Sequence, residues 1–243
     1  HTYNSLKKSY LLIKKKICTS LITLPINKEK IIKNIDSKFK DQTEFLSKLD
    51  NKKYSNMIFY SKKIIISILS THIPIFKVSS FIKNKDLIYK KIVQLEQSLK
   101  YDLNISHPKI VICGMNPHAG ENGYIGNEEI KYFKPIIKKL IEHNINISGP
   151  FSADTIFNKI NIKKFDCFVA IYHDQGLIPF KLLTGYEGVN YTSSLDIIRT
   201  SPAHGTAINI KSMNKANDQS LINSFILSDK IYKNRIRNKI DFC

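Results

Sequence analysis

Three histidines each follow a short apolar segment, at the point where a buried strand would give way to a loop. They are His72 in IIISILSTHIPI, His118 in KIVICGMNPHAG and His173 in DCFVAIYHDQG. Ligand sites in open α/β sheets form outside the carboxyl ends of the strands. Three imidazoles that converge there would leave coordination positions open, which is typical of a catalytic metal site. We therefore predict a divalent-metal site at His72, His118 and His173, although a single strand-end histidine is usually an ordinary polar residue.

A glycine-rich segment, GMNPHAGENGYIGNEE, lies between an expected strand and an expected helix. Gly120, Gly123 and Gly126 would let backbone amides approach a ligand, and the following helix would offer its positive N-terminal end to a phosphate or carboxylate. The spacing matches neither the dinucleotide fingerprint nor a P-loop. The three glycines are therefore candidates for cofactor binding, and a loop that merely turns is the alternative.

Two basic residues and an amide follow the third histidine: Lys181, Asn190 and Arg199. Such a set suits a phosphorylated substrate with a carboxylate, because arginine binds an oxyanion with two hydrogen bonds and lysine adds a mobile charge. Lysine is common in this chain, so a solvated surface residue is the alternative for Lys181.

The elements that must position these residues alternate along the chain. Apolar runs at 56–61, 63–70, 109–113 and 166–173 indicate strands, although the run at 63–70 is also compatible with a helix. Helices are expected over 79–103, beginning at Ser79 or Ser80, and over 127–144, 174–183 and 220–239. This alternation predicts an α/β fold with a mainly parallel sheet. We expect one unit over residues 1–243, with no internal boundary and an incomplete N-terminus.

Composition limits the classes of partner. The chain has a net charge of +18, but its lysines are spread along nearly every segment and no RNA-binding or zinc-finger motif occurs. We therefore expect no nucleic-acid partner, and the lack of an apolar run of spanning length predicts no membrane. Cys113 and Cys167 lie in apolar runs and no CxxC occurs, which favours reduced thiols and a cytoplasmic location.

Taken together, several segments resemble the 4-hydroxythreonine-4-phosphate dehydrogenase family of vitamin B6 (pyridoxal phosphate) biosynthesis. They are PINKE, STHIPI, GMNPHAGENGYIGNEE, GPFSADTIF, YHDQGLIPFKLL and GVNYTSSLDIIRTSPAHGTA. The resemblance runs through nearly the whole chain. It implies an isocitrate/isopropylmalate-dehydrogenase-like fold, with mainly parallel sheets, flanking helices and two subdomains around a central cleft. It also implies a homodimer with the metal site at its interface.

The resemblance assigns the three histidines to the metal, and Lys181, Asn190 and Arg199 to the substrate. The implied reaction is the NAD- or NADP-dependent oxidation of 4-phosphooxy-L-threonine to 3-amino-2-oxo-4-phosphooxybutanoate, which loses CO2 to give 3-amino-2-oxopropyl phosphate. The metal, one of Zn, Co, Mg or Mn, would lower the pKa of the substrate hydroxyl. The nicotinamide would take the hydride. No general base is assigned.

One segment departs from the family pattern, since GHTEF appears here as DQTEF. Gln42 and Thr43 are expected to contact the substrate, but Gln42 cannot carry the charge of the family's histidine. Asp41 adds a negative charge and lacks the backbone freedom of glycine. The alternatives are a dehydrogenase for another phosphorylated hydroxy acid such as a phosphothreonate, a degenerate non-catalytic relative, and a basic nucleic-acid-associated protein.

Overall fold

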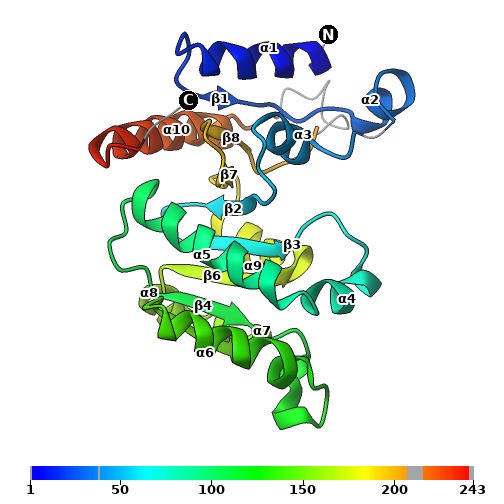
Figure 1. Cartoon of the computed structure of the whole chain (residues 1–243), viewed down its shortest axis with the longest axis vertical. Helices are drawn as coiled ribbons and strands as arrows, with labels where there is room; N and C mark the ends of the chain where they lie inside the picture. Colours follow the sequence, from blue (N-terminus) through cyan, green and yellow to red (C-terminus); the bar gives the residue numbers. More distant parts are fainter. Residues whose placement is uncertain (1, 38, 207–215, 241–243) are drawn as a thin grey trace. The chain divides into compact units, whose positions relative to one another are not determined.

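The computed structural model describes residues 2–37, 39–206 and 216–240. The chain divides into two compact units, one formed by residues 1–55 with 186–243 (unit 1) and the other by residues 56–185 (unit 2). Each unit has its own strands and covering helices (Figure 1). The division falls inside the stretch for which the sequence predicted no boundary.

Unit 2 is built on five strands that pair side by side. Its strands are β2 (Asn56–Tyr60), β3 (Ile65–Ser70), β4 (Ile110–Cys113), β5 (Ile147–Phe151) and β6 (Cys167–Tyr172). Their spatial order is β2-β3-β6-β4-β5; all neighbours are parallel except β2, which is antiparallel to β3. Every residue of β3 and β4 is buried. Burial on both faces explains why β3 has no alternating pattern and could not be told from a helix by periodicity.

Helices cover both faces of this sheet, with α5 and α6 on one face and α9 on the other (Figure 1). The helical elements of unit 2 are η1 (Ile75–Lys77), α4 (Val78–Ile82), α5 (Lys85–Tyr101), η2 (Pro117–Gly123), η3 (Glu129–Phe133), α6 (Lys134–Glu142), α7 (Ala153–Ile156), α8 (Lys159–Lys164) and α9 (His173–Thr184). The prediction of one continuous helix over residues 79–103 is wrong. The side chain of Asn84 accepts a hydrogen bond from the Leu87 amide at 3.0 Å and begins a new helix, α5.

Unit 1 contains three strands that pair with one another. In it, β8 (Arg199–Pro202) pairs in parallel with β1 (Leu21–Ile22) and antiparallel with β7 (Val189–Ser193). Its helices are α1 (Thr2–Lys14), α2 (Lys28–Asn34), α3 (Gln42–Leu49) and α10 (Gln219–Arg237), and α10 packs on all three strands. A buried apolar cluster joins α1, α3 and the turn between β7 and β8: Tyr10, Ile13, Leu46, Leu195 and Ile197.

The mainly parallel α/β fold with flanking helices is therefore confirmed. No helix within the described ranges is both long enough and apolar enough to cross a membrane.

Candidate functional site

The three predicted metal histidines follow three neighbouring parallel strands. His72 comes after β3, His118 lies in η2 after β4, and His173 is the first residue of α9, directly after β6. Because β3, β6 and β4 are adjacent and parallel, all three carboxyl ends meet at the same edge of the sheet. All three side chains are exposed. The sheet therefore brings the three histidines to one edge, as the sequence predicted.

At this edge the rings of His72 and His173 lie side by side, with their centroids 6.5 Å apart. Nδ1 of His173 is 2.7 Å from Oδ1 of Asp174, a contact that leaves Nε2 available for a ligand. Across residues 2–37, 39–206 and 216–240, no three His, Cys, Asp or Glu side chains already stand in a ligating arrangement. Imidazole nitrogen is a good ligand for zinc and other transition metals, so the three side chains have the right chemistry for a metal site. That they bind one metal ion together stays a prediction.

The ends of these strands are tied together by two polar side chains that the sequence did not single out for this role. The hydroxyl of Ser70 donates to the Ile171 carbonyl at 2.6 Å, which joins β3 to β6. The Gln175 amide accepts from the Ile171 N–H and donates to the Gly114 carbonyl, both at 2.7 Å, which joins β6 to β4. The bonds from Ser70 to Ile171 and from Gln175 to Gly114 join segments far apart in the chain. No local sequence pattern could have identified them.

The backbone is strained at two of the histidines. His72 has a φ of 55°, and residues 118–122 form a left-handed turn with φ between 43° and 78°. Left-handed backbone costs about 1–2 kcal/mol for each residue with a Cβ, and such strain persists where the surrounding structure fixes it, often at functional sites.

The predicted cofactor glycines are accounted for by the packing of their own loop. A Cβ at Gly120 would lie 2.6 Å from the Gly126 carbonyl oxygen, and one at Gly123 would lie 2.6 Å from Asn127 Oδ1. A Cβ at Gly126 would collide with the amide of Asn116. These contacts explain the glycines without a ligand and do not outline a nicotinamide pocket. Cofactor binding by Gly120, Gly123 and Gly126 stays a prediction.

Asp154 is an acidic residue near His118 that the sequence analysis did not identify. Its pKa is lowered, chiefly by a hydrogen bond from the Ser152 hydroxyl and further by the charge of His118. Both residues are exposed. The Asp154 carboxylate lies close enough to His118 for the two side chains to interact electrostatically.

In unit 1 the predicted substrate residues gather around Arg199. The guanidinium donates to Thr23 Oγ1 at 2.7 and 3.0 Å, to Thr192 Oγ1 at 2.8 Å, and to Thr43 Oγ1 and Gln42 Oε1 at 3.3 Å. All of these acceptors are neutral. Thr23 and Thr192 were not predicted; the alternation of Asn190 and Thr192 along one face of a strand was the available signal for Thr192.

Arg199 is 4% exposed, and burial lowers the pKa of its guanidinium to about 10 while the carboxylate of Asp41 opposes the shift. The group therefore remains a cation at neutral pH. The guanidinium keeps its positive charge among neutral oxygens, but all five of its N–H donors are used in these hydrogen bonds. An anion that binds here would therefore have to replace one of the longer bonds, to Thr43 or to Gln42.

Asn190 lies on β7 two residues before Thr192, which pairs with Arg199. Its Oδ1 is buried and has no hydrogen-bond partner within the described chain. Buried polar atoms are rarely left without a partner, so this oxygen is available to a donor on a ligand. Lys181, by contrast, is an exposed residue of α9 in unit 2.

The departure at residues 41 and 42 is accommodated in the structure. Asp41 has φ −164°, which is extended backbone that any residue adopts, and its carboxylate caps α3 by accepting from the Glu44 amide at 2.8 Å. The backbone freedom of glycine is therefore not required at residue 41. The Gln42 amide donates to the Leu24 carbonyl at 3.0 Å while its oxygen faces Arg199.

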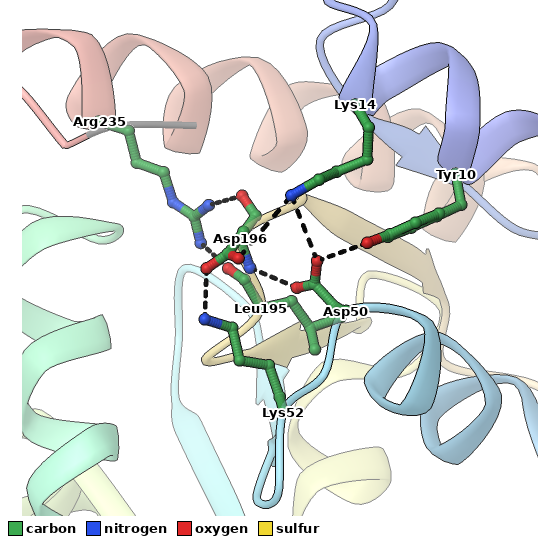
Figure 2. Close-up of polar contacts among 7 residues, drawn as sticks. All are labelled: Tyr10, Lys14, Asp50, Lys52, Leu195, Asp196 and Arg235. Carbon is green, nitrogen blue, oxygen red and sulfur yellow. Dashed lines mark hydrogen bonds and ion pairs between the residues drawn. The ribbon is translucent and has the colours of Figure 1, made fainter. Parts of the chain in front are cut away.

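A buried polar network holds the turn between β7 and β8, which leads into Arg199 (Figure 2). Asp50 accepts from the Tyr10 hydroxyl at 3.1 Å and from the Asp196 amide at 2.6 Å. Arg235 of α10 donates to the carbonyls of Asp196 and Leu195 at 2.8 and 3.2 Å. Residues from α1, the end of α3 and α10 thus fix the conformation of this turn, and with it the start of β8.

Comparison with known proteins gives one consistent family. A family model described as pyridoxal phosphate biosynthetic protein PdxA matches residues 1–228. A 4-hydroxythreonine-4-phosphate dehydrogenase from Sulfurihydrogenibium sp. is 43% identical over 86% of this chain and 64% of its own length. A D-threonate 4-phosphate dehydrogenase from Pectobacterium atrosepticum is 37% identical over 93% of this chain and 68% of its own length.

Among solved structures, the crystal structure of 4-hydroxythreonine-4-phosphate dehydrogenase from Klebsiella pneumoniae superposes with a TM-score of 0.82. It is 32% identical to this chain and covers 95% of it, while this chain covers 70% of that structure. The chain spans less than two thirds of the length of two relatives, the one from Sulfurihydrogenibium and a 4-hydroxythreonine-4-phosphate dehydrogenase from Bacteroides thetaiotaomicron.

Proposed function

The chain belongs to the PdxA family of pyridoxal phosphate biosynthetic proteins, and on this premise we propose that it oxidises 4-phosphooxy-L-threonine with NAD or NADP. The reaction uses a divalent metal, Zn, Co, Mg or Mn, held by His72, His118 and His173. The enzyme acts as a homodimer in the cytoplasm, with the metal site at the interface between subunits.

The observation that carries this proposal is the buried Arg199 guanidinium, with its neutral acceptors and the unpartnered Asn190 Oδ1 nearby. This pair offers a fixed positive charge to a phosphate or carboxylate and an acceptor to an amine or hydroxyl. A phosphorylated hydroxy amino acid carries all of these groups. Thr43 adds a hydroxyl at the same guanidinium, and Lys181 contributes a mobile charge.

The substrate hydroxyl lies on the carbon β to the carboxylate. Its oxidation removes a hydride, which a bound nicotinamide would accept, and a proton, which would leave to solvent. The product is therefore a β-keto acid, 2-amino-3-oxo-4-phosphooxybutanoate rather than the 3-amino-2-oxo isomer expected above, and it loses CO2 to give 3-amino-2-oxopropyl phosphate. A divalent metal, when bound, supplies a Lewis acid that favours the ionised hydroxyl and the loss of CO2.

This chain's residues hold and orient the substrate. Arg199 and Lys181 bind its anions, and Asn190 and Thr43 fix its hydrogen-bonding groups. Asp174, 2.7 Å from Nδ1 of His173, would accept a hydrogen bond from that nitrogen and leave Nε2 to hold a metal.

The test measures NAD and NADP reduction by the purified chain with 4-phosphooxy-L-threonine, with the metal added or chelated. The full-length Klebsiella relative serves as the positive control. We expect metal-dependent turnover that His118→Ala abolishes while the circular dichroism spectrum is unchanged. Unaltered turnover in His118→Ala would contradict the metal assignment, and no turnover by a folded, metal-bound chain would favour a non-catalytic relative.

A second candidate is a dehydrogenase for another phosphorylated hydroxy acid, of which D-threonate 4-phosphate is the first to test. The Pectobacterium relative that carries this name matches 93% of the chain, and Gln42 replaces the histidine of the family pattern. The same assay with both substrates separates the candidates, because the higher kcat/KM identifies the substrate class.

A further inference from the structure

Glu129 is a buried carboxylate with no role in the proposed chemistry. Its residue is 1% exposed and opens the π-helical turn η3 that precedes α6. Oε1 accepts from the backbone amides of Met115 and Asn116 at 2.7 and 2.8 Å. Oε2 accepts from the side-chain amide of Asn116 at 2.9 Å. The groups that stabilise this buried anion therefore come from the loop that carries His118.

The loop also closes tightly around the carboxylate. A Cβ at Gly120 would lie 2.7 Å from Oε2 of Glu129, and one at Gly114 would lie 3.3 Å from Oε1. The left-handed turn at residues 118–122 lies between Asn116 and the end of the loop. Consecutive left-handed residues are not stable by themselves, so this turn needs anchors outside it. Glu129 supplies one immediately before the turn and fits closely against Gly120 within it.

We propose that Glu129 is a positioning residue for His118. Its carboxylate fixes the loop of residues 114–126, including the left-handed turn at 118–122, so that the imidazole is held at the carboxyl end of β4. Glu129 itself touches neither metal nor substrate. The inference rests on the proposed metal role of His118, and it predicts that loss of the carboxylate weakens metal binding while the sheet stays folded.

The test compares Glu129→Gln with the wild type in the full chain. Glutamine has the same shape, but its NH2 group would face N–H donors that now meet an oxygen. Glu121→Gln is the matched control, because it removes the same charge from an exposed residue of the same loop. Calorimetry and visible absorption measure Co²⁺ binding, and hydrogen-exchange mass spectrometry follows the peptide that covers residues 115–126.

We expect Glu129→Gln to bind Co²⁺ about tenfold or more weakly, as for losses of groups that orient a ligand. We also expect faster exchange over residues 115–126, with wild-type behaviour in Glu121→Gln. Wild-type affinity and exchange in Glu129→Gln would overturn the inference.

Two further outcomes remain decisive. If the wild type binds no Co²⁺, the proposed metal role fails by itself, and exchange over residues 115–126 alone decides whether Glu129 anchors the His118 loop. If Glu129→Gln does not fold, Asn116→Ala takes its place, because it removes the donor to Oε2 and keeps the carboxylate. We expect Asn116→Ala to lower Co²⁺ affinity and accelerate exchange, and wild-type values in that variant would overturn the inference.

Discussion

At the scale of single residues, the surroundings of Arg199 decide what unit 1 can bind. The guanidinium is buried, yet its hydrogen bonds go to hydroxyl and amide oxygens of Thr23, Gln42, Thr43 and Thr192. With a pKa of about 10, it stays charged throughout the neutral range. Binding of an anion by this group should therefore not weaken between pH 6 and pH 8 through loss of its proton.

Arg199→Lys tests the geometry of this cation rather than its charge. An ammonium group cannot reproduce the planar set of donors that reaches both Thr23 and Thr192. We expect substrate affinity to fall about tenfold or more and the free energy of unfolding to fall by about 1–3 kcal/mol. Calorimetry and denaturant unfolding measure the two effects. Arg237→Lys, at an exposed arginine of α10, is the control, and equal behaviour of the two variants would contradict the assignment.

Gln42→His tests the departure from the family pattern. A histidine beside Arg199 can gain a proton near neutrality, whereas Gln42 cannot. We expect the ratio of variant to wild-type substrate affinity to rise as the pH falls and the imidazole gains its proton. The neighbouring guanidinium disfavours that proton, so the rise begins at a lower pH than for an ordinary histidine. The ratio removes the titration of the substrate's own phosphate. Gln97→His, at an exposed glutamine of α5, should give a flat ratio, and a flat ratio for Gln42→His would place residue 42 outside the binding site.

At the scale of elements, the carboxyl ends of β3, β6 and β4 form the proposed metal edge. These elements were predictable as apolar runs, but the side chains that tie their ends, Ser70 and Gln175, act across the sheet. The helix that crosses from β3 to β4, α5, carries a buried lysine. Lys91 is 7% exposed, and burial lowers its pKa to about 8.

Lys91→Met should stabilise the chain at pH 7. Below pH 8 Lys91 is charged in the folded protein, where burial disfavours the charge. Removing the charge therefore adds roughly 1–2 kcal/mol to the free energy of unfolding. Between about pH 8 and 10.5 the folded state binds fewer protons at this site than the unfolded state. Wild-type stability therefore rises with pH relative to the variant, and the difference shrinks.

Denaturant unfolding at a series of pH values measures the effect. Lys90→Met is the matched control, because Lys90 is exposed on the same helix and pairs with exposed Asp86. A stability difference for Lys91→Met that does not change with pH would contradict the assigned pKa.

At the scale of the whole molecule, the net charge of +18 is its most unusual bulk property. We expect weak binding of nucleic acid of any sequence at low salt, lost by about 0.2 M salt, because spread lysines neutralise phosphates without reading bases. Fluorescence anisotropy with labelled DNA and RNA of different sequences measures this. Binding that prefers one sequence and survives at the higher salt would instead support a nucleic-acid function.

The two units have separate tasks in the proposed function. Unit 2 carries the three histidines and Lys181, and unit 1 carries Gln42, Thr43, Asn190 and Arg199. The sequence predicted both sets of residues but no boundary between them. The chain divides near residues 55 and 186 because residues make most of their contacts within their own unit. No change of composition marks these two positions.

The sequence by itself determined the apolar segments, the histidines at their ends and the family. Each follows from local signals, namely apolar runs with a polar residue after them and motifs in a fixed order. It could not determine that β3 is a strand rather than a helix, that Thr23 meets Arg199 across 176 residues, that β6 lies between β3 and β4, or that Glu129 accepts hydrogen bonds from the His118 loop. Strand order and buried polar contacts depend on pairing between distant segments, and only the folded chain brings those segments together.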